Sequence, residues 1–421
     1  MLDISTIGII VLVITIISYA TEIVPLPITA VGSCLLMAIA GASSFKDAFS
    51  GFGNDTLMMV VGMSIVGDTL FATGAANYIG KKIVRAFGKT EKMFIMACVV
   101  ITATLSAFLS NTATAAMMFP IMASAVASSK GRLTKKYSYM AVGFAAIAGG
   151  GCTLIGSTPQ VIAQGLLVDA GLEGASFFEY MAAGLPKVLI LLVYFLTIGL
   201  KLGQKTFDFE EPEDETSVPD GEEKLTGKMI LSMLILLGCV VGFITDLWTL
   251  GGVAMVGGVL CVITKCIDFK PMVRNLDWTT IIVVGGSLGF ASCIDKSGAG
   301  VAIANFMVGV LGDSVSPVVL IAVLGLLAVI MGNLMTHTST AAILVPITIY
   351  IAQGMGINVR SAALAIVMFV NITYCTPIMT PAATMTLAAG YRFKDYVRVG
   401  GLLNVISYAA MVAMLPILFQ F

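Results

Sequence analysis

The chain has 421 residues, of which 58% are hydrophobic and 11% are charged, and its mean hydropathy is +1.00. An average soluble domain carries about 25% charged residues, so this composition excludes cytosolic enzymes, secreted disulfide scaffolds and disordered regulators and indicates a protein surrounded by lipid. Because 23 lysines and arginines balance 24 aspartates and glutamates, the chain has no bulk basic surface, and we expect no nucleic-acid partner.

Ten apolar segments are long enough to cross a bilayer, whose hydrocarbon core of ~30 Å needs about 20 helical residues. We therefore predict an all-α integral membrane protein with many spans, located by default in a bacterial plasma membrane. In chain order the predicted spans are residues 5–20, 27–42, 55–75, 137–168, 178–202, 229–246, 250–265, 278–298, 358–390 and 398–420.

Two further apolar stretches, 93–128 and 317–352, are too long for one span, and a polar cluster interrupts each near its middle. Splitting the first stretch at Ser110 leaves two arms of roughly 25 Å and 23 Å at a rise of 1.5 Å per residue, which is short for a membrane crossing. We predict that both stretches are re-entrant hairpins that enter and leave on one side. Such a hairpin requires that its tip line a polar cavity.

The longest polar stretch, 204–227, contains the run EEPEDETSVPDGEE and is predicted to be a flexible cytoplasmic linker. With this linker inside, 19 of the 23 basic residues fall in cytoplasmic loops, as the positive-inside rule requires. The exceptions, expected at or near the outer face, are Lys46, Lys187, Lys296 and Arg360. Both chain termini are then expected outside.

Residues 1–203 and 228–421, on either side of the linker, resemble each other and are predicted to be two repeats. VVGMS at 60–64 matches VVGGS at 283–287, and SNTATAAMMFPI at 110–121 matches THTSTAAILVPI at 336–347, at offsets of 223 and 226. Each repeat holds five spans and one hairpin, and because five is odd, the second repeat must be inverted. Inverted repeats with interrupted helices are typical of secondary transporters, which bind substrate near the midplane.

Four polar clusters mark the expected site. Those at 110–112 and 336–340 fall at the hairpin tips, and those at 156–160 and 376–381 fall inside predicted spans, where proline predicts broken helices. A broken helix offers free N–H groups to anions and free carbonyls to cations. The clusters therefore suit an anion accompanied by a hard cation such as sodium, and we expect no catalytic residue and no cofactor other than this coupling ion.

The segments SNTATAA, GCTLIGSTPQVI, THTSTAAILVPI and TPIMTPAATM resemble the hairpin and broken-helix motifs of the divalent anion/sodium symporters (the DASS family), carriers of di- and tricarboxylates within the ion transporter superfamily. The resemblance implies a homodimer whose protomers move a transport domain like an elevator against a scaffold. The substrate-binding residues that it implies are Ser110, Asn111, Thr112, Ser157, Thr158, Pro159, Thr336, His337, Thr338, Thr380 and Pro381. The sodium ligands that it implies are Ser110, Asn111, Thr153 and Gly156 at one site and Thr338, Thr376 and Ala383 at the other.

The second half departs from the family pattern. Thr-His-Thr at 336–338 replaces the usual Ser-Asn-Thr, and Ala382 and Ala383 replace Pro and Asn, so the second sodium site is expected to be degraded. His337 is the only histidine; neutral, it can replace the asparagine as a donor, and charged, it can stand in place of a sodium ion.

The expected substrates are small dicarboxylates such as succinate, malate, fumarate and 2-oxoglutarate. Cation symport, dicarboxylate exchange and proton coupling through His337 all remain open. The rival within transport is an antiporter of sodium and protons or of inorganic anions, and the rival from another class is a membrane-embedded hydrolase. Asp68, inside the third span, is expected to be structural and hydrogen-bonded to a neighbouring Ser or Thr, with proton coupling as the alternative.

Overall fold

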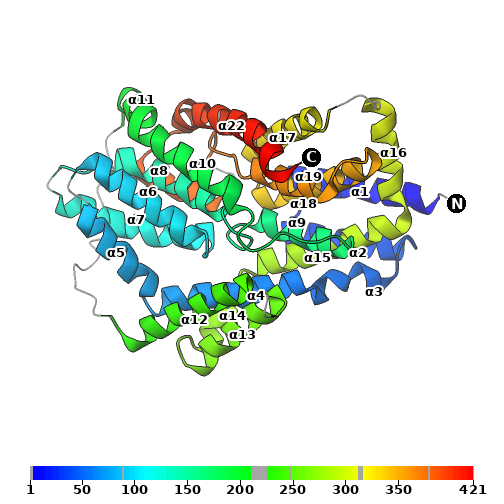
Figure 1. Ribbon diagram of the computed structural model, residues 1–421, viewed down its shortest axis with the longest axis horizontal. Coiled ribbons are helices and arrows are strands. Elements are labelled where there is room, and N and C mark those ends of the chain that lie inside the picture. The colour runs from blue at the N-terminus through cyan, green and yellow to red at the C-terminus, as the bar shows by residue number, and fades with distance from the viewer. Residues whose placement is uncertain are drawn as a thin grey trace.

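The computed structural model describes residues 3–87, 90–129, 131–209, 225–245, 248–311, 316–377 and 380–420. These residues form an elongated array of helices and contain no strand (Figure 1). Seven helices among them are long and apolar enough to cross a membrane, judged by length and composition. They are Ile4–Thr21, Asp55–Ala72, Met181–Thr206, Gly227–Ile244, Trp278–Ser297, Pro317–Leu334 and Phe393–Phe419.

The part before the linker extends from α1 to α11. Its helices are α1 (Ile4–Thr21), α2 (Leu26–Ile39), α3 (Phe45–Ala48), η1 (Ser50–Gly53), α4 (Asp55–Ala72), α5 (Ala75–Phe87), α6 (Glu91–Ser106), α7 (Asn111–Ser128), α8 (Lys135–Gly150), α9 (Thr158–Asp169), α10 (Met181–Tyr194), η2 (Phe195–Gly199) and α11 (Leu200–Thr206).

The part after the linker repeats this order. Its helices are α12 (Gly227–Ile244), α13 (Leu250–Ile263), α14 (Phe269–Asn275), α15 (Trp278–Ser297), α16 (Ala299–Leu311), α17 (Pro317–Leu334), α18 (His337–Gly354), α19 (Val359–Val370), α20 (Pro381–Thr384), η3 (Met385–Ala389), α21 (Phe393–Asp395), η4 (Tyr396–Gly400) and α22 (Gly401–Phe419). Helices occupy all ten predicted spans. Most of the predicted acidic linker, 210–224, lies outside the described residues.

A pair of consecutive helices occupies each predicted hairpin, and the chain leaves helical structure at each predicted break. The first hairpin is α6 with α7, the second is α17 with α18, and the two helices of each are in contact. Residues 151–157 separate α8 from α9, and residues 371–380 separate α19 from α20. The hairpins turn at the same position because Ser110 caps α7 by accepting from Ala113 N at 3.2 Å, as Thr336 caps α18 by accepting from Ser339 N at 3.2 Å.

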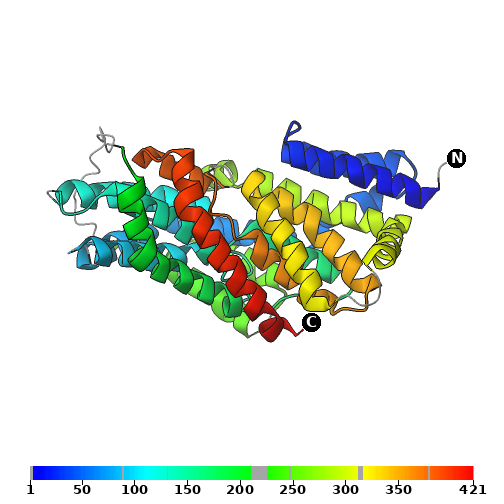
Figure 2. The ribbon, with the colours of Figure 1, turned by 90° about the horizontal axis from the view of Figure 1, so that it is seen from above.

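The two parts exchange partners where they pack. The second long helix of each part, α2 or α13, packs against the third long helix of the other part, α15 or α4. Gly62 permits the α4–α13 contact, since a Cβ there would lie 2.3 Å from the carbonyl carbon of Ala254. Figure 2 shows α1 and α2 at the end of the molecule that carries the N-terminus, and α22 running obliquely across the middle to the C-terminus.

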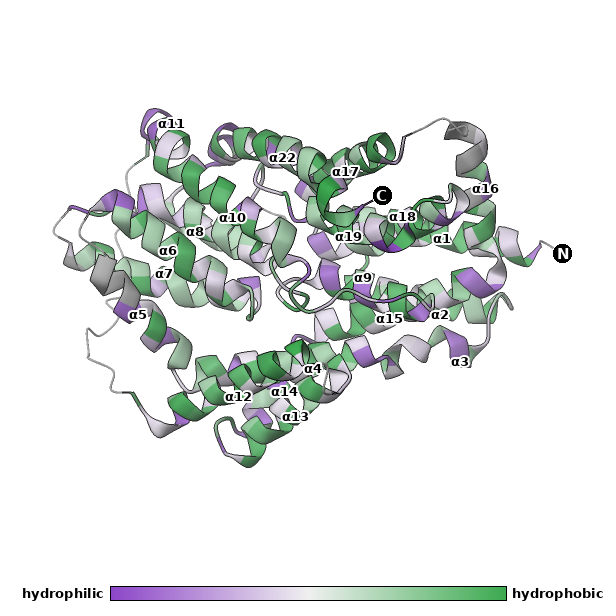
Figure 3. Ribbon diagram, viewed as in Figure 1, coloured by the Kyte–Doolittle hydropathy of each residue, from purple (hydrophilic) through white to green (hydrophobic). Residues whose placement is uncertain are grey.

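Apolar residues dominate the outward faces of the long helices. Hydrophobic residues cover much of α10, α12, α13 and α17, while hydrophilic residues gather at the end that carries α5 and α11 (Figure 3). Large apolar side chains such as Leu234, Val259 and Val323 are exposed on these helices. An apolar belt of this extent needs lipid around it, and the chain is an integral, multi-pass membrane protein.

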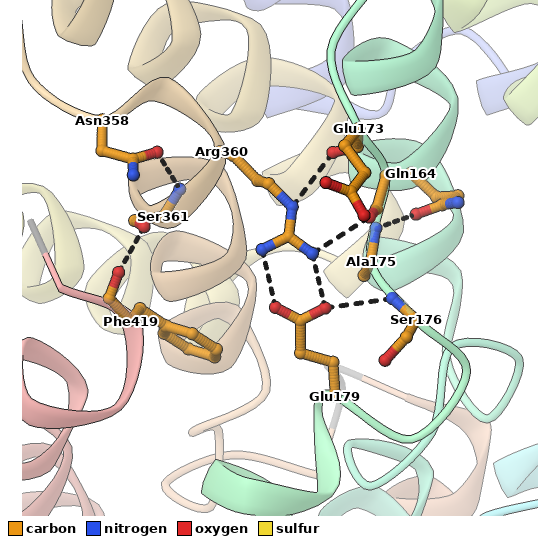
Figure 4. Close-up of polar contacts among 10 residues, drawn as sticks. Gln164, Glu173, Ala175, Ser176, Glu179, Asn358, Arg360, Ser361 and Phe419 are labelled. Atoms are coloured by element: carbon orange, nitrogen blue, oxygen red, sulfur yellow. Dashed lines mark hydrogen bonds and ion pairs between the residues drawn. The ribbon is translucent and has the colours of Figure 1, made fainter.

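An ion pair fastens the connection between α9 and α10 to the start of α19 (Figure 4). Arg360 donates to both carboxylate oxygens of Glu179, at 2.8 and 2.6 Å, and to the backbone oxygens of Glu173 and Gly174, both at 3.1 Å. This two-pronged geometry is the strong form of an Arg–carboxylate contact. It joins the two parts of the chain at one end of the broken helices.

The expectation for Asp68 was wrong in one respect. Its Oδ2 is buried and has no hydrogen-bond partner among the described residues, so no neighbouring Ser or Thr hydroxyl satisfies it. The hydroxyls of Thr69 and Thr73, which flank it on α4, instead donate to backbone carbonyls of their own helix.

Candidate functional site

The two helix breaks meet in the interior of the protein. Ser157, the last residue before α9, donates from Oγ to Oδ1 of Asn371, the residue that ends α19, at 3.1 Å. Both side chains are buried. Residues more than 200 positions apart, one from each part of the chain, therefore form the centre of one polar region.

The first hairpin tip is bonded to the first break. Asn111, the first residue of α7, has its amide placed so that Nδ2 donates to Ser106 Oγ (2.7 Å), Ala146 O (2.9 Å) and Gly156 O (3.1 Å). Thr153 Oγ1 also donates across this contact, to the carbonyl of Ala107. The tip and the break therefore hold each other in place.

Glycine makes this approach possible. A Cβ on Gly150 would lie 2.1 Å from the amide nitrogen of the Asn111 side chain, and a Cβ on Gly156 would lie 2.5 Å from Gly150 O. A larger residue at Gly150 would displace the hairpin tip, and a larger residue at Gly156 would displace the end of α8. Close packing thus explains two of the glycines in the run GGGCTLIG at 149–156, namely Gly150 and Gly156.

The second hairpin tip is bonded to the second break in a different way. His337 is buried, and its Nε2 is hydrogen-bonded to Thr373 Oγ1. Asn333, in the last turn of α17, accepts from Cys375 N at 2.9 Å, and its backbone oxygen accepts from Thr376 Oγ1 at 2.8 Å. The predicted site residues His337 and Thr376 thus lie at one junction.

Each hairpin also reaches the other half of the site, because α7 contacts α20 and α18 contacts α9. Four helices begin at the predicted clusters, and their first turns contain most of the predicted substrate-binding residues. Ser110, Ser157, Thr336 and Thr380 are the N-cap residues of α7, α9, α18 and α20. Asn111, Thr112, Thr158, Pro159, His337, Thr338, Pro381 and Ala383 lie within the first turns of these helices.

The predicted sodium ligands are divided unequally between the halves. Thr153 and Thr376 each donate to a backbone oxygen of a hairpin, Ala107 O and Asn333 O respectively, whereas Ala383 offers only backbone atoms, and its N–H donates to Thr380 Oγ1. In the described ranges no group of three or more His, Cys, Asp or Glu side chains is arranged to hold a metal ion. A coupling cation here would use hydroxyl and carbonyl oxygens.

Three buried polar atoms without partners in the described ranges lie in this region, and others lie elsewhere, at Asp68 and Tyr180 for example. Among the described residues, Gln160 Oε1, Tyr374 OH and Thr114 Oγ1 have no hydrogen-bond partner although no surface is exposed at these atoms. Such atoms are uncommon in folded proteins and are expected where an ion, a water molecule or a ligand binds. Gln160 lies in the first turn of α9, and Tyr374 lies in the second break.

A carboxylate of the protein itself sits on the second hairpin tip, which the sequence reasoning missed. Glu22 ends α1 with a left-handed φ of 48°, and its Oε1 accepts from Thr336 N and Ser339 Oγ, both at 3.2 Å. The start of α18 therefore already has the geometry to bind a carboxylate. The available signal was an acidic residue in the short turn between the first two spans.

Three more buried polar side chains reach the breaks from helices that the sequence analysis treated as apolar. They are Lys187 on α10, Asn333 on α17 and Asn404 on α22. The placement of Lys187 at the outer face was wrong: its side chain is wholly buried, and its Nζ donates to Met368 O at 3.3 Å. In the sequence, each of these three residues stands as a single polar residue within a long apolar run, and this pattern could have indicated a buried functional side chain.

Interrupted helices and hairpin tips that meet at a polar centre, inside an all-helical membrane protein, define a secondary transporter and not an enzyme. The profile of the family described as "Citrate transporter" matches residues 10–344, and the chain belongs to this family. The resemblance to the divalent anion/sodium symporters is thereby confirmed.

Full-length relatives agree with this assignment. The chain is 24% identical to the sodium-dependent dicarboxylate transporter SdcS of Staphylococcus saprophyticus, over 94% of this chain and 82% of that protein. It is also 24% identical to an uncharacterized transporter of Methanocaldococcus jannaschii, over 98% of this chain and 93% of that protein.

Two solved structures share the fold. MtrF of Neisseria gonorrhoeae, described among antimetabolite efflux pumps, superposes with a TM-score of 0.62 and 12% identity, covering 99% of this chain and 95% of its own. The YdaH transporter of Alcanivorax borkumensis gives a TM-score of 0.65 with 14% identity, covering 91% and 87%. At these identities the likeness concerns the fold alone.

Proposed function

We propose that the protein is a secondary active transporter of small dicarboxylates such as succinate, malate, fumarate or 2-oxoglutarate, with sodium as a coupling ion. The observation that carries the proposal is the Ser157–Asn371 hydrogen bond, which joins two helix breaks, each already bonded to a hairpin tip. Helix N-termini favour anions, and four of them begin at this centre. Each tip would bind one carboxylate of a substrate with two.

Glu22 supports the choice of a carboxylate over other anions. Its contact with Thr336 N and Ser339 Oγ is the hydrogen-bonding pattern that a substrate carboxylate would need at the second tip. Ser110 Oγ and the backbone N–H groups of Asn111 and Thr112, at the start of α7, would serve the other carboxylate at the first tip. The similarity to SdcS, a sodium-dependent dicarboxylate transporter, supports the same substrate and ion.

The coupling mode follows from charge. Importing a dianion against 100 mV costs roughly 4.6 kcal/mol, so net uptake needs at least three accompanying cations for inward charge movement. Exchange of one dicarboxylate for another cancels this cost. Because Ala383 removes one side-chain oxygen from the second sodium site, we infer that exchange is the principal mode, with sodium at the first site.

We further propose that residues 1–203 and 228–421 are inverted repeats, and that the protein works as a homodimer by an elevator motion. The reciprocal packing of α2 with α15 and of α4 with α13 supports the repeats. In this arrangement the two hairpins and the broken helices α8–α9 and α19–α20 move together as the transport domain.

The experiment is uptake of radiolabelled succinate by liposomes that contain the purified protein, with and without internal unlabelled succinate and with and without sodium. We expect internal succinate to accelerate uptake at least tenfold and sodium to increase it further. Sodium or proton flux that succinate does not alter would contradict the proposal and favour an ion antiporter. Turnover of a substrate without its movement across the membrane would instead indicate a hydrolase.

A further inference from the structure

Lys187 lies between the ends of the two interrupted helices. Its Nζ donates to the carbonyl of Met368, in the last turn of α19, at 3.3 Å. It also lies 3.1 Å from where a Cβ on Gly151 would be, and Gly151 caps the end of α8. No part of the Lys187 side chain is exposed.

The surroundings of this ammonium group are negative without containing an acid. A helix C-terminus carries about −0.5 of an elementary charge, so the two helix ends together supply roughly one negative charge. Within the described ranges, no carboxylate lies within ion-pair distance of Lys187. The helix ends offset part of the cost of burying this charge, but an ammonium group with one carbonyl partner still has unused donors that a further anion can accept from.

Lys187 adjoins the proposed substrate site on both sides. Gly151 follows Gly150, whose Cα faces the Asn111 amide at the first hairpin tip. Met368 precedes Asn371, which accepts from Ser157, by less than one helical turn. The positive charge is therefore held beside the first half-site by α10, a helix that contributes none of the predicted ligands.

The second half has a neutral group in the corresponding place. Asn404 reaches the second break from α22, the last helix of that half, where it accepts from Tyr374 N at 2.8 Å and donates to Cys375 Sγ at 2.9 Å. Lys187 likewise approaches the first break from α10, beside Cys152. One half of the site thus carries a fixed cation, and the other carries an amide.

We propose that Lys187 is a built-in counter-cation for the bound dicarboxylate, which stands in place of one coupling cation. This inference rests on the proposed function. Lys187 is a positioning and charge-balancing residue. It adds one positive charge to a site whose other polar groups, hydroxyls and amides, are neutral. A dianion then needs a single sodium ion to neutralise it.

The test measures succinate binding to the purified wild type and to Lys187→Met, Lys187→Arg and Lys201→Met, as a function of sodium concentration. We expect Lys187→Met to weaken succinate binding by roughly tenfold or more, and to weaken monomethyl succinate, which carries one charge, distinctly less. Lys187→Arg should stay within a few-fold of wild type. Lys201, exposed on α11, is the charge-matched control and should have no effect.

The wild type alone also tests the idea, in case Lys187→Met does not fold. The slope of log affinity for succinate against log sodium concentration should be one or less, and a slope of two would overturn the inference. Equal losses for succinate and its monomethyl ester, or unchanged binding in Lys187→Met, would also overturn it. Absence of dicarboxylate binding by the wild type would instead mean that the proposed function is wrong.

Discussion

Asn111 and His337 hold the same position in the two hairpin tips, yet they bond to different groups. Asn111 donates to the backbone carbonyls of Ala146 and Gly156, whereas His337 bonds to the hydroxyl of Thr373. The amide therefore orders the backbone of the first break, and the imidazole orders one side chain of the second. Replacement at position 111 should consequently have the larger structural effect.

Asn111→Asp tests this difference. The carboxylate would place oxygen against the two backbone oxygens that now accept from the amide, so we expect a loss of about 1–3 kcal/mol in the free energy of unfolding and loss of succinate binding. Thermal unfolding in detergent and equilibrium binding measure the two effects. Asn358→Asp is the control, because Asn358 only accepts from Ser361 N at a helix start and a carboxylate can do the same. Retained binding in Asn111→Asp would show that the amide is dispensable.

Glu22 makes a second prediction at the residue scale. If its carboxylate occupies groups that a substrate carboxylate needs, then Glu22→Gln should tighten succinate binding by roughly two- to tenfold, since the neutral amide competes less well for a helix N-terminus. The same change should lower stability by about 0.3–1 kcal/mol. Glu173→Gln, an exposed glutamate on the α9–α10 connection, should change neither quantity. Weaker succinate binding in Glu22→Gln would mean that Glu22 assists the substrate.

Most elements could be predicted from the sequence because hydropathy, proline and the repeat act locally. The ten spans, the hairpins and the two breaks each follow from runs of apolar residues and from polar clusters at matching positions. The approach of Lys187, Asn333 and Asn404 to the breaks could not be predicted, because it depends on how α10, α17 and α22 are rotated against their neighbours. Pairwise contact of helices, not periodicity, decides which face of an apolar helix is buried.

Glycine positions within helices give a test at the scale of elements. In Gly62→Ala the new Cβ would collide with the backbone of α13, so the α4–α13 contact would have to open, at a cost of about 1–3 kcal/mol. Gly238→Ala is the matched control in α12, where nothing lies within 4 Å of the added carbon. The thermal transition and the yield of monodisperse protein report the outcome. Equal behaviour of the two variants would show that α4 and α13 tolerate a wider separation.

At the scale of the molecule, the proposed elevator requires hairpin 317–354 to slide against the helices that do not carry substrate. A cavity of about 260 Å³ lies between α9, α15 and α18, and Asp295 of α15 and Tyr350 of α18 both line it. These two side chains are on elements that the elevator would move apart, and neither belongs to the proposed substrate site. A link between them should therefore stop movement without removing the binding groups.

The prediction is that crosslinking Asp295→Cys to Tyr350→Cys with a short bis-methanethiosulfonate reagent lowers succinate exchange at least tenfold, and that reductant restores it. The native cysteines allow this design, since seven of the eight are buried and the partly exposed Cys375 can be replaced by serine. Succinate binding in detergent should persist in the crosslinked protein, because the link lies outside the site. Each single-cysteine variant is a control for modification alone. Full exchange in the crosslinked protein would exclude relative movement of α15 and α18 and leave local opening of the hairpin as the way in which the site reaches either side.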